Sequence, residues 1–322
     1  MAYNKTESYN MSTITTQLII NQENSTKASE EVKEELISIE KRMSFFLENS
    51  DISKINRNSG LLGKVVIHPD TLEVIEKSIE YSRLTDGAFD ITLAPVIREW
   101  GIFSDHERIP DNETLEELIK LVGYQNIYID KLAMSVGLKY PGQKIDLGAI
   151  AKGYATDKAI EIYRKYGISS AMINIGGNVT VLGGKENGEP WAVGIQNPES
   201  PRGETVGVLL CEDTSVVTSG NYVRNFSAQG NVYGHIIETR TGIPVQNDLA
   251  SVTVVCDSAI KADALSTAIF TMGIEKGLDF IRTVPDICAI LITDQKEIYI
   301  SSGLKDKFYL EDQTGFRGIW FS

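Results

Sequence analysis

The chain has 322 residues, of which 42% are hydrophobic and 23% charged, so it can bury a sizeable core and is not expected to be disordered. Its 44 Asp and Glu residues outnumber its 31 Lys and Arg residues, which gives a formal net charge of −13. Because no block of basic residues stands out, nucleic acid is not an expected partner. An anionic substrate would need a local cation or a helix N-terminus.

Membrane spans and disulfide or zinc scaffolds are also not expected. No run of about 18 apolar residues occurs. The N-terminal stretch has neither a basic and apolar leader nor a cysteine that could carry a lipid, so we expect a cytoplasmic protein. The three cysteines Cys211, Cys256 and Cys288 are widely spaced and odd in number, which argues against a disulfide framework and a zinc site.

The first predicted elements are a strand at residues 12–21 and a helix after it. Apolar residues in this helix recur three and four positions apart, at Val32, Leu36, Ile39, Met43 and Phe46. The polar segment 48–60 is expected to end the helix, and residues 65–68 to form a short strand.

Two further helices are indicated by capping boxes. Asp70, with Glu73 three residues later, is expected to cap a helix that continues to about residue 83. Thr114 and Glu117 form a second such box.

The second half of the chain is rich in predicted strands. Residues 145–167 indicate a strand, a tight turn and a helix closed by Gly167. Seven β-like stretches follow, at 170–175, 179–183, 191–195, 206–211, 214–218, 231–238 and 251–256. A helix at 259–270 and a terminal hairpin at 288–301 complete the pattern.

This order of elements favours one fold class. Strands predominate, helices are few and long, and strict strand–helix alternation is absent, so we expect an α+β fold with mostly antiparallel sheets. Because there is no internal repeat and no Pro- or Ser-rich linker, a single domain is predicted for residues 11–322, after a flexible tail of residues 1–10.

Several common catalytic patterns are absent. His68, His106 and His235 are not paired at metal-binding spacing, and no G-x-S-x-G elbow occurs. The segment VLGGKE lacks the first glycine and the final Ser/Thr of a phosphate loop. No G-x-G-x-x-G follows the first strand, so a dinucleotide would have to bind in a non-Rossmann way.

Polar residues gather near expected turns in four segments, TDGAFDITLAP (85–95), IDLGAIAKGYATD (145–157), VVTSGNYVRNF (216–226) and GHIIETRTGIP (234–244). Asp90 and Thr92 would face one side of a strand, and Lys152 in the first turn of a helix suits a phosphate. Arg224 adds a cation, and His235 is the only histidine that lies among these polar motif residues. A helix cap for Asp90, a solvated charge for Lys152 and a strand histidine for His235 are the plain alternatives. The joint occurrence of these four polar segments favours a functional site over the plain alternatives.

The helix AIKADALSTAIF (259–270) carries a polar pair within an apolar stripe. Asp263 and Thr267 are one turn apart, so a carboxylate and a hydroxyl share one side. A buried carboxylate is costly unless it is paired or binds a metal.

In chain order, the motifs TxGxFDxT–P, DLGxIAKGYAxD, INxGGN, TSGxYxRxF, a histidine followed by TG-x-P, and ADALSTA resemble the ApbE-type FAD:protein FMN transferases. The resemblance extends from Met11 to the terminal hairpin. It implies an α+β fold similar to the tunnelling fold. It also implies Mg²⁺-dependent transfer of FMN from FAD to a Thr or Ser hydroxyl of an electron-transfer flavoprotein, with release of AMP. The acceptor would carry a D-x-x-(S/T)-G-A-(S/T) type of segment.

The resemblance also implies site residues. The metal ligands would be the Asp263 carboxylate, the Thr267 hydroxyl and the Ala149 backbone carbonyl. His235 belongs to the active centre, as a base for the incoming hydroxyl or as a group that orients the phosphate, and Asp263 is the alternative base. Contacts to FAD are implied for Met11, Ala88, Phe89, Asp90, Asp146, Lys152 and Ile237.

Two positions depart from the family pattern. Glu238-Thr239 stands where the family usually has Asp-Pro, and Ser12 where it commonly has Gly. Neither departure touches the metal motif. Two alternatives to transfer remain open: FAD hydrolysis to FMN and AMP, and a non-catalytic FAD-binding protein.

Overall fold

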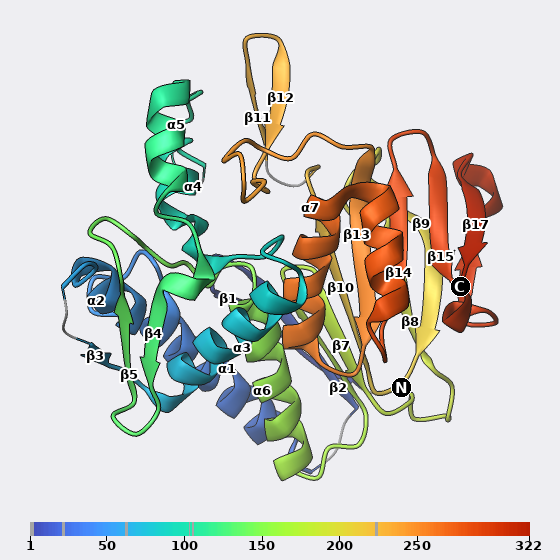
Figure 1. Ribbon diagram of the computed structural model, residues 1–322. Coiled ribbons are helices and arrows are strands. Elements are labelled where there is room, and N and C mark those ends of the chain that lie inside the picture. The colour runs from blue at the N-terminus through green and yellow to red at the C-terminus, as the bar shows by residue number, and fades with distance from the viewer. Residues whose placement is uncertain (1–2, 21–22, 62–63, 103, 105, 223–224) are drawn as a thin grey trace. The chain divides into compact units, whose positions relative to one another are not determined.

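The computed structural model describes residues 3–20, 23–61, 64–102, 104, 106–222 and 225–322. They form helices and mainly antiparallel strands, so the predicted α+β class is confirmed (Figure 1). Contacts group the chain into two compact units. We call residues 1–38, 152–220 and 247–322 the sheet unit, and residues 39–151 and 221–246 the helical unit.

A nine-stranded sheet forms the centre of the sheet unit. Its strand order is β1-β2-β6-β7-β10-β13-β14-β15-β17, and neighbours are antiparallel except for the parallel pair β15 and β17. The strands are β1 (Tyr3–Asn10), β2 (Thr13–Ile20), β6 (Ala171–Ile175), β7 (Asn178–Leu182), β10 (Thr214–Gly220), β13 (Leu249–Cys256), β14 (Cys288–Thr293), β15 (Glu297–Ser301) and β17 (Arg317–Phe321).

Both faces of the central strands are covered. A second antiparallel sheet, β16-β9-β8, shares an apolar cluster with the large sheet, to which Trp191, Leu209, Val216 and Ile290 belong. Helix α7 lies across β10 and β13 (Figure 1). The remaining elements of this unit are β8 (Trp191–Gln196), β9 (Thr205–Cys211), β16 (Phe308–Leu310), α6 (Ala151–Lys165), α7 (Ala259–Thr283), η3 (Ser302–Leu304) and η4 (Asp312–Thr314).

The helical unit contains short helices, a three-stranded sheet and a separate hairpin. Helix α1 (Ser25–Met43) begins in the sheet unit and ends in the helical unit. The other elements are α2 (Asp51–Arg57), β3 (Val65–Val66), α3 (Pro69–Leu84), η1 (Ile91–Leu93), α4 (Ala94–Glu99), α5 (Asn112–Ile119), η2 (Tyr124–Asn126), β4 (Ile127–Asp130), β5 (Ser135–Leu138), β11 (Asn225–Ala228) and β12 (Asn231–Gly234). Among the described residues, no helix combines the length and the apolar character needed to cross a membrane.

The predicted N-terminal tail, residues 1–10, is wrong for the residues described, because Tyr3–Asn10 forms β1 and pairs with β2 along its whole length. β1 is an edge strand with polar residues on both faces, so it lacks the alternating hydrophobicity that identifies a half-buried strand. The single domain predicted for residues 11–322 stays a prediction, and the segments of the two compact units alternate along the chain.

Several helix boundaries also differ from the prediction. The polar segment 48–60 contains α2, which is capped by the Ser50 side chain. The cap of α3 is His68 rather than Asp70, and the cap of α5 is Asp111 rather than Thr114. In both cases the residue predicted as the cap lies inside the first turn, and its backbone N–H donates to the true cap.

Most of the strands predicted for the second half of the chain are confirmed in the sheet unit. The terminal hairpin is confirmed as β14 and β15. The strand predicted from residue 145 is absent, and residues 145–147 are described without regular secondary structure. The stretch 231–238 is a strand only as far as Gly234.

The turn between β1 and β2 leads to a stability prediction. Met11 and Ser12 both have positive φ, 52° and 59°, between the paired residues Asn10 and Thr13. This geometry favours glycine, and a left-handed non-glycine residue costs about 1–2 kcal/mol. We therefore expect Ser12→Gly to raise the free energy of unfolding by about 1 kcal/mol, measured by chemical denaturation. Glu7→Gly in the adjoining strand should lower it instead, and a loss of stability in Ser12→Gly would contradict this interpretation.

Candidate functional site

Asp263 lies in the first half of α7, at the end that is anchored to α6. Ser258 is the N-cap of α7. Asp157 of α6 adds a second cap, because its carboxylate accepts the backbone N–H groups of Ala259 at 2.8 Å and Ile260 at 3.0 Å. Burial raises the pKa of the Asp157 carboxyl, and these hydrogen bonds oppose the rise. The start of α7 is thus fixed to α6.

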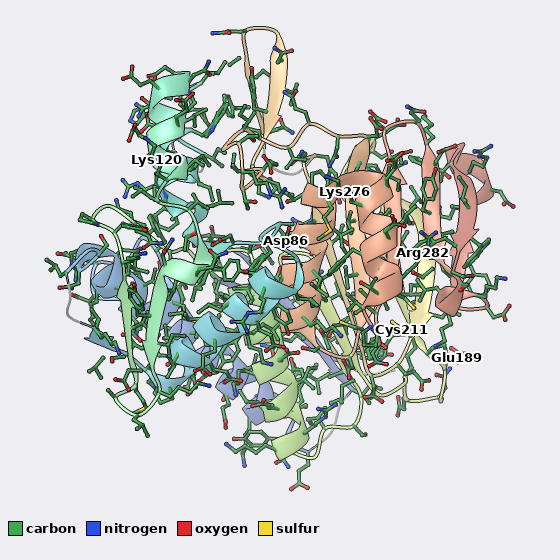
Figure 2. All side chains as sticks on the ribbon, viewed as in Figure 1. Asp86, Lys120, Glu189, Cys211, Lys276 and Arg282 are labelled. Carbon is green, nitrogen blue, oxygen red and sulfur yellow. The ribbon has the colours of Figure 1, made fainter. Side chains whose placement is uncertain are left out.

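A kink divides α7 into two halves of different character. Gly273 has φ 75° and ψ −178°, and Asn247 donates a 2.6 Å hydrogen bond to the Phe270 carbonyl just before it. The second half carries exposed charged side chains such as Lys276 and Arg282, both labelled in Figure 2. The first half is mostly apolar and buried, so Asp263 stands apart from its neighbours.

Asp263 is only 3% exposed, and its carboxylate is compensated by the first turn of α6. Its Oδ2 accepts the Gly153 backbone N–H at 2.8 Å. The Lys152 Nζ lies 3.4 Å from Oδ1 and 3.5 Å from Oδ2. A Cβ on Gly153 would lie 2.4 Å from the Ala259 carbonyl oxygen, so glycine permits this close approach of α6 and α7. The buried carboxylate therefore has an ion-pair partner within the sheet unit.

Thr267, one turn after Asp263, belongs to a cluster of hydroxyl groups. Its Oγ1 is 3.2 Å from the Ser219 Oγ at the end of β10, and 3.4 Å from the backbone carbonyl of Asp263. The Ser219 Oγ also lies 2.9 Å from the Ser266 Oγ. Asp263 and Thr267 thus lie one turn apart on α7, the carboxylate hydrogen-bonded to α6 and the hydroxyl to β10.

These oxygens fit the ligand chemistry of Mg²⁺. Mg²⁺ prefers hard oxygen ligands and usually combines one or two carboxylates with waters. The Asp263 carboxylate accepts one backbone N–H and faces an ammonium group at salt-bridge distance, so acceptor capacity remains. Among the described residues, no group of three or more His, Cys, Asp or Glu side chains could hold a metal ion. A metal here would therefore rely on one carboxylate together with hydroxyl, carbonyl and water oxygens.

Asp90 is a structural cap in the helical unit. Its Oδ1 accepts the Thr92 backbone N–H at 2.8 Å and the Thr92 hydroxyl at 2.6 Å, and its Oδ2 accepts the Tyr124 N–H at 2.8 Å. Burial raises the pKa of Asp90 against these hydrogen bonds. The two residues begin a 3₁₀ helix and not a strand, so the alternative of a cap is confirmed. Beside Asp90, Phe89 is buried and Ala88 is half-buried.

The segment that contains Asp146 and Ala149 lies beside the Asp90 segment. The Asp146 backbone N–H donates to the Ile91 carbonyl at 2.9 Å, and its Oδ1 accepts the Gly148 N–H at 2.9 Å. Ala149 is half-buried in the turn that leads into α6. The helical unit therefore brings together four of the predicted FAD contacts, namely Ala88, Phe89, Asp90 and Asp146.

His235 follows β12 and lines a cavity of about 310 Å³ in the helical unit. The other lining residues are Ile102, Glu107, Asn225, Phe226, Tyr233 and Gly234. Phe226 and Tyr233 are stacked across the hairpin, with ring centroids 5.4 Å apart. The half-buried imidazole thus borders a space with aromatic walls and one carboxylate. Arg224, a predicted cation, lies outside the described residues.

The loop after His235 is ordered by Glu238. Its carboxylate accepts the backbone N–H groups of Arg240 at 3.2 Å and Thr241 at 2.8 Å. Its own backbone pairs with Ile243 and Gly242 at 2.9 Å each. Ile237, a predicted FAD contact, is buried in the apolar cluster of this unit.

Trp100 contacts the chain on both sides of His235. Its ring packs 5.4 Å from that of Tyr233, two residues before the histidine, and its Nε1 donates a 2.7 Å hydrogen bond to the Gly242 carbonyl after it. Trp100 is 2% exposed. The ring therefore holds the two ends of the His235 segment together.

Replacing Trp100 by Phe should cost more stability than the same change at Trp191. The first change leaves the buried Gly242 carbonyl without its partner, which costs about 1–3 kcal/mol. The indole N–H of Trp191 is buried without a hydrogen-bond partner among the described residues, so Trp191→Phe loses only packing. We expect the two free energies of unfolding, measured in urea, to differ by about 1 kcal/mol or more. Equal losses of unfolding free energy in the two variants would show that the hydrogen bond from Trp100 contributes nothing to stability.

Comparison with known proteins now decides the family. The family model of ApbE matches residues 11–291. This chain belongs to the ApbE family. The FAD:protein FMN transferase of Klebsiella pneumoniae strain 342 is 34% identical to it over 259 residues, which cover 80% of each protein. That of Treponema pallidum strain Nichols is 31% identical over 279 residues, 82% of this chain and 76% of the relative.

Solved ApbE structures share the fold. The ApbE protein of Thermotoga maritima MSB8 has a TM-score of 0.88 at 31% identity, over 95% of this chain and 99% of that one. The flavin transferase ApbE from Vibrio cholerae has a TM-score of 0.84 at 27% identity, again over 95% and 99%. The resemblance stated from the motifs is thus confirmed.

Three residues in or near the ApbE motifs have roles that the sequence analysis missed. Gly153 and Asp157 lie inside IDLGAIAKGYATD, where the glycine permits helix approach and the aspartate caps α7. The sequence did contain a signal for these roles, because a glycine and a carboxylate four residues apart lie on one face of a helix. Trp100 lies outside the motifs, and no local pattern indicated its contact with Gly242.

Proposed function

We propose that this chain is a Mg²⁺-dependent FAD:protein FMN transferase. It transfers FMN from FAD to a Thr or Ser hydroxyl of an acceptor flavoprotein and releases AMP. One observation carries the proposal: a chain 34% identical to a FAD:protein FMN transferase has a buried carboxylate and a hydroxyl one helical turn apart, at Asp263 and Thr267. The acceptor would carry a D-x-x-(S/T)-G-A-(S/T) type of segment. The cytoplasmic location stays a prediction.

The reaction exchanges one phosphorus–oxygen bond for another. The acceptor oxygen attacks the FMN phosphorus of FAD, the bond from that phosphorus to the bridging oxygen breaks, and AMP leaves with that oxygen. The acceptor hydroxyl loses its proton to a base on the protein. Asp263, Thr267 and the Ala149 carbonyl would hold Mg²⁺, which would supply neutralisation of the pyrophosphate charge.

We propose His235 as that base. An imidazole is a competent base near neutral pH, and His235 borders a cavity of about 310 Å³. Asp263, the alternative base, accepts the Gly153 N–H, faces the Lys152 ammonium and is proposed as a metal ligand. In this proposal His235 receives the proton and Asp263 serves as a ligand of the metal.

The residues proposed to contact FAD are Met11, Ala88, Phe89, Asp90, Asp146, Lys152 and Ile237. The ammonium of Lys152 suits a phosphate in a chain with a formal net charge of −13. The Asp90 oxygens already accept three hydrogen bonds, so its side chain serves FAD chiefly by shaping the loop of Ala88 and Phe89.

Quantifying AMP and free FMN by chromatography tests the proposal. The protein is incubated with FAD and Mg²⁺, with and without the acceptor. The transferase should release AMP only with the acceptor, and without an equal amount of free FMN. Equal AMP and FMN without the acceptor would identify FAD hydrolysis, and FAD binding without either product would identify a non-catalytic protein.

A further inference from the structure

Lys152 has a position that its proposed contact with FAD does not explain. Its Nζ lies within 3.5 Å of both carboxylate oxygens of Asp263, and only 4% of the Asp263 side chain is exposed. A buried carboxylate without a compensating charge is strongly destabilising. The positive charge that makes burial of Asp263 tolerable is therefore supplied by this chain itself.

We propose that Lys152 is the exchangeable counter-ion of Asp263 and competes with Mg²⁺ for its carboxylate. This inference rests on the metal site of the proposed function. Apart from Lys152, the carboxylate contacts only the neutral Gly153 N–H among the hydrogen-bonding groups of the described residues. The Lys152 ammonium and Mg²⁺ would therefore use the same two carboxylate oxygens. An ammonium group this close also repels an incoming cation. Lys152 therefore lowers the affinity of the site for Mg²⁺.

The geometry of α6 makes such an exchange feasible. Gly153 is fixed by its hydrogen bond to Asp263 and by its close approach to Ala259, so the backbone of this turn has little freedom to move. The Lys152 side chain is about a quarter exposed, and its flexible four-carbon stem lets the ammonium move while the backbone stays in place. An ammonium released from Asp263 remains on the first turn of α6, where it can pair with phosphate.

Titration with Mg²⁺ alone tests the exchange, without FAD or acceptor. Isothermal titration calorimetry and thermal unfolding would compare the unmodified protein with Lys152→Met. Removing a like charge from beside the site removes its electrostatic repulsion, so we expect Lys152→Met to bind Mg²⁺ about tenfold more tightly. We also expect Lys152→Met to have a lower Tm without Mg²⁺ and to gain more Tm from Mg²⁺. If Lys152→Met does not fold, Lys152→Gln takes its place.

The control is Lys158→Met on the same helix, since Lys158 pairs with Glu161 rather than with Asp263. It should bind Mg²⁺ as the unmodified protein does. Equal or weaker Mg²⁺ binding by Lys152→Met, with normal binding by the unmodified protein, would overturn the exchange and leave the proposed function intact. Absence of Mg²⁺ binding in every variant would overturn the exchange together with the metal site.

Discussion

Asp263→Asn is expected to reduce FMN transfer by about 10³-fold while the protein stays folded. The change removes the only carboxylate among the proposed metal ligands, and the loss corresponds to about 4 kcal/mol of charge stabilisation at the transition state. The asparagine oxygen can still accept the Gly153 N–H, so the contact between α6 and α7 is retained. The rate of AMP release with the acceptor present measures transfer, and circular dichroism measures whether the protein stays folded.

Asp279→Asn is the matched control for this change. Asp279 lies on the same helix after the kink, with 79% of its side chain exposed, and pairs with Arg282. Its replacement should leave transfer unchanged, because surface ion pairs contribute little. Wild-type rates for Asp263→Asn at saturating Mg²⁺ would show that this carboxylate is not a metal ligand.

His235→Gln is expected to lower kcat by about 10²–10⁴-fold, the usual contribution of general base catalysis. Glutamine retains hydrogen-bonding groups but cannot take a proton near neutral pH. We therefore expect the KM for FAD to change much less than kcat. Steady-state kinetics at several pH values would measure both parameters, and kcat of the variant should lose the pH dependence due to the imidazole.

His106→Gln controls for the loss of a histidine as such. His106 is exposed in the same unit and does not line the cavity of His235. It should keep normal kcat and KM. If His235→Gln raised only the KM for FAD, His235 would bind or orient the phosphate instead of removing the proton.

The sequence predicted the fold class because the periodic apolar patterns were strong. The apolar stripe of residues 259–270 and the terminal hairpin reflect burial, which leaves a regular signature. β1 was missed because an edge strand with two polar faces has no such signature. α2 was missed because only Ile52 and Ile55 mark its buried side within a polar segment.

The sequence offered candidate site residues one by one, but it did not indicate the contacts among them. The motifs drew attention to Asp263 and Lys152 for separate reasons, one for a metal and the other for a phosphate. Their ion pair joins residues more than a hundred positions apart, and no local spacing encodes it. The same holds for Trp100 and Gly242. Long-range polar contacts depend on tertiary packing, which periodicity does not report.

The most direct test of the transferase function is the intact mass of the acceptor. The acceptor protein is incubated with this chain, FAD and Mg²⁺, beside a variant in which the acceptor Thr or Ser is replaced by Ala. We expect the acceptor to gain the mass of one FMN moiety and the Ala variant to gain none. An unchanged acceptor mass, with FAD converted to free FMN and AMP, would contradict it.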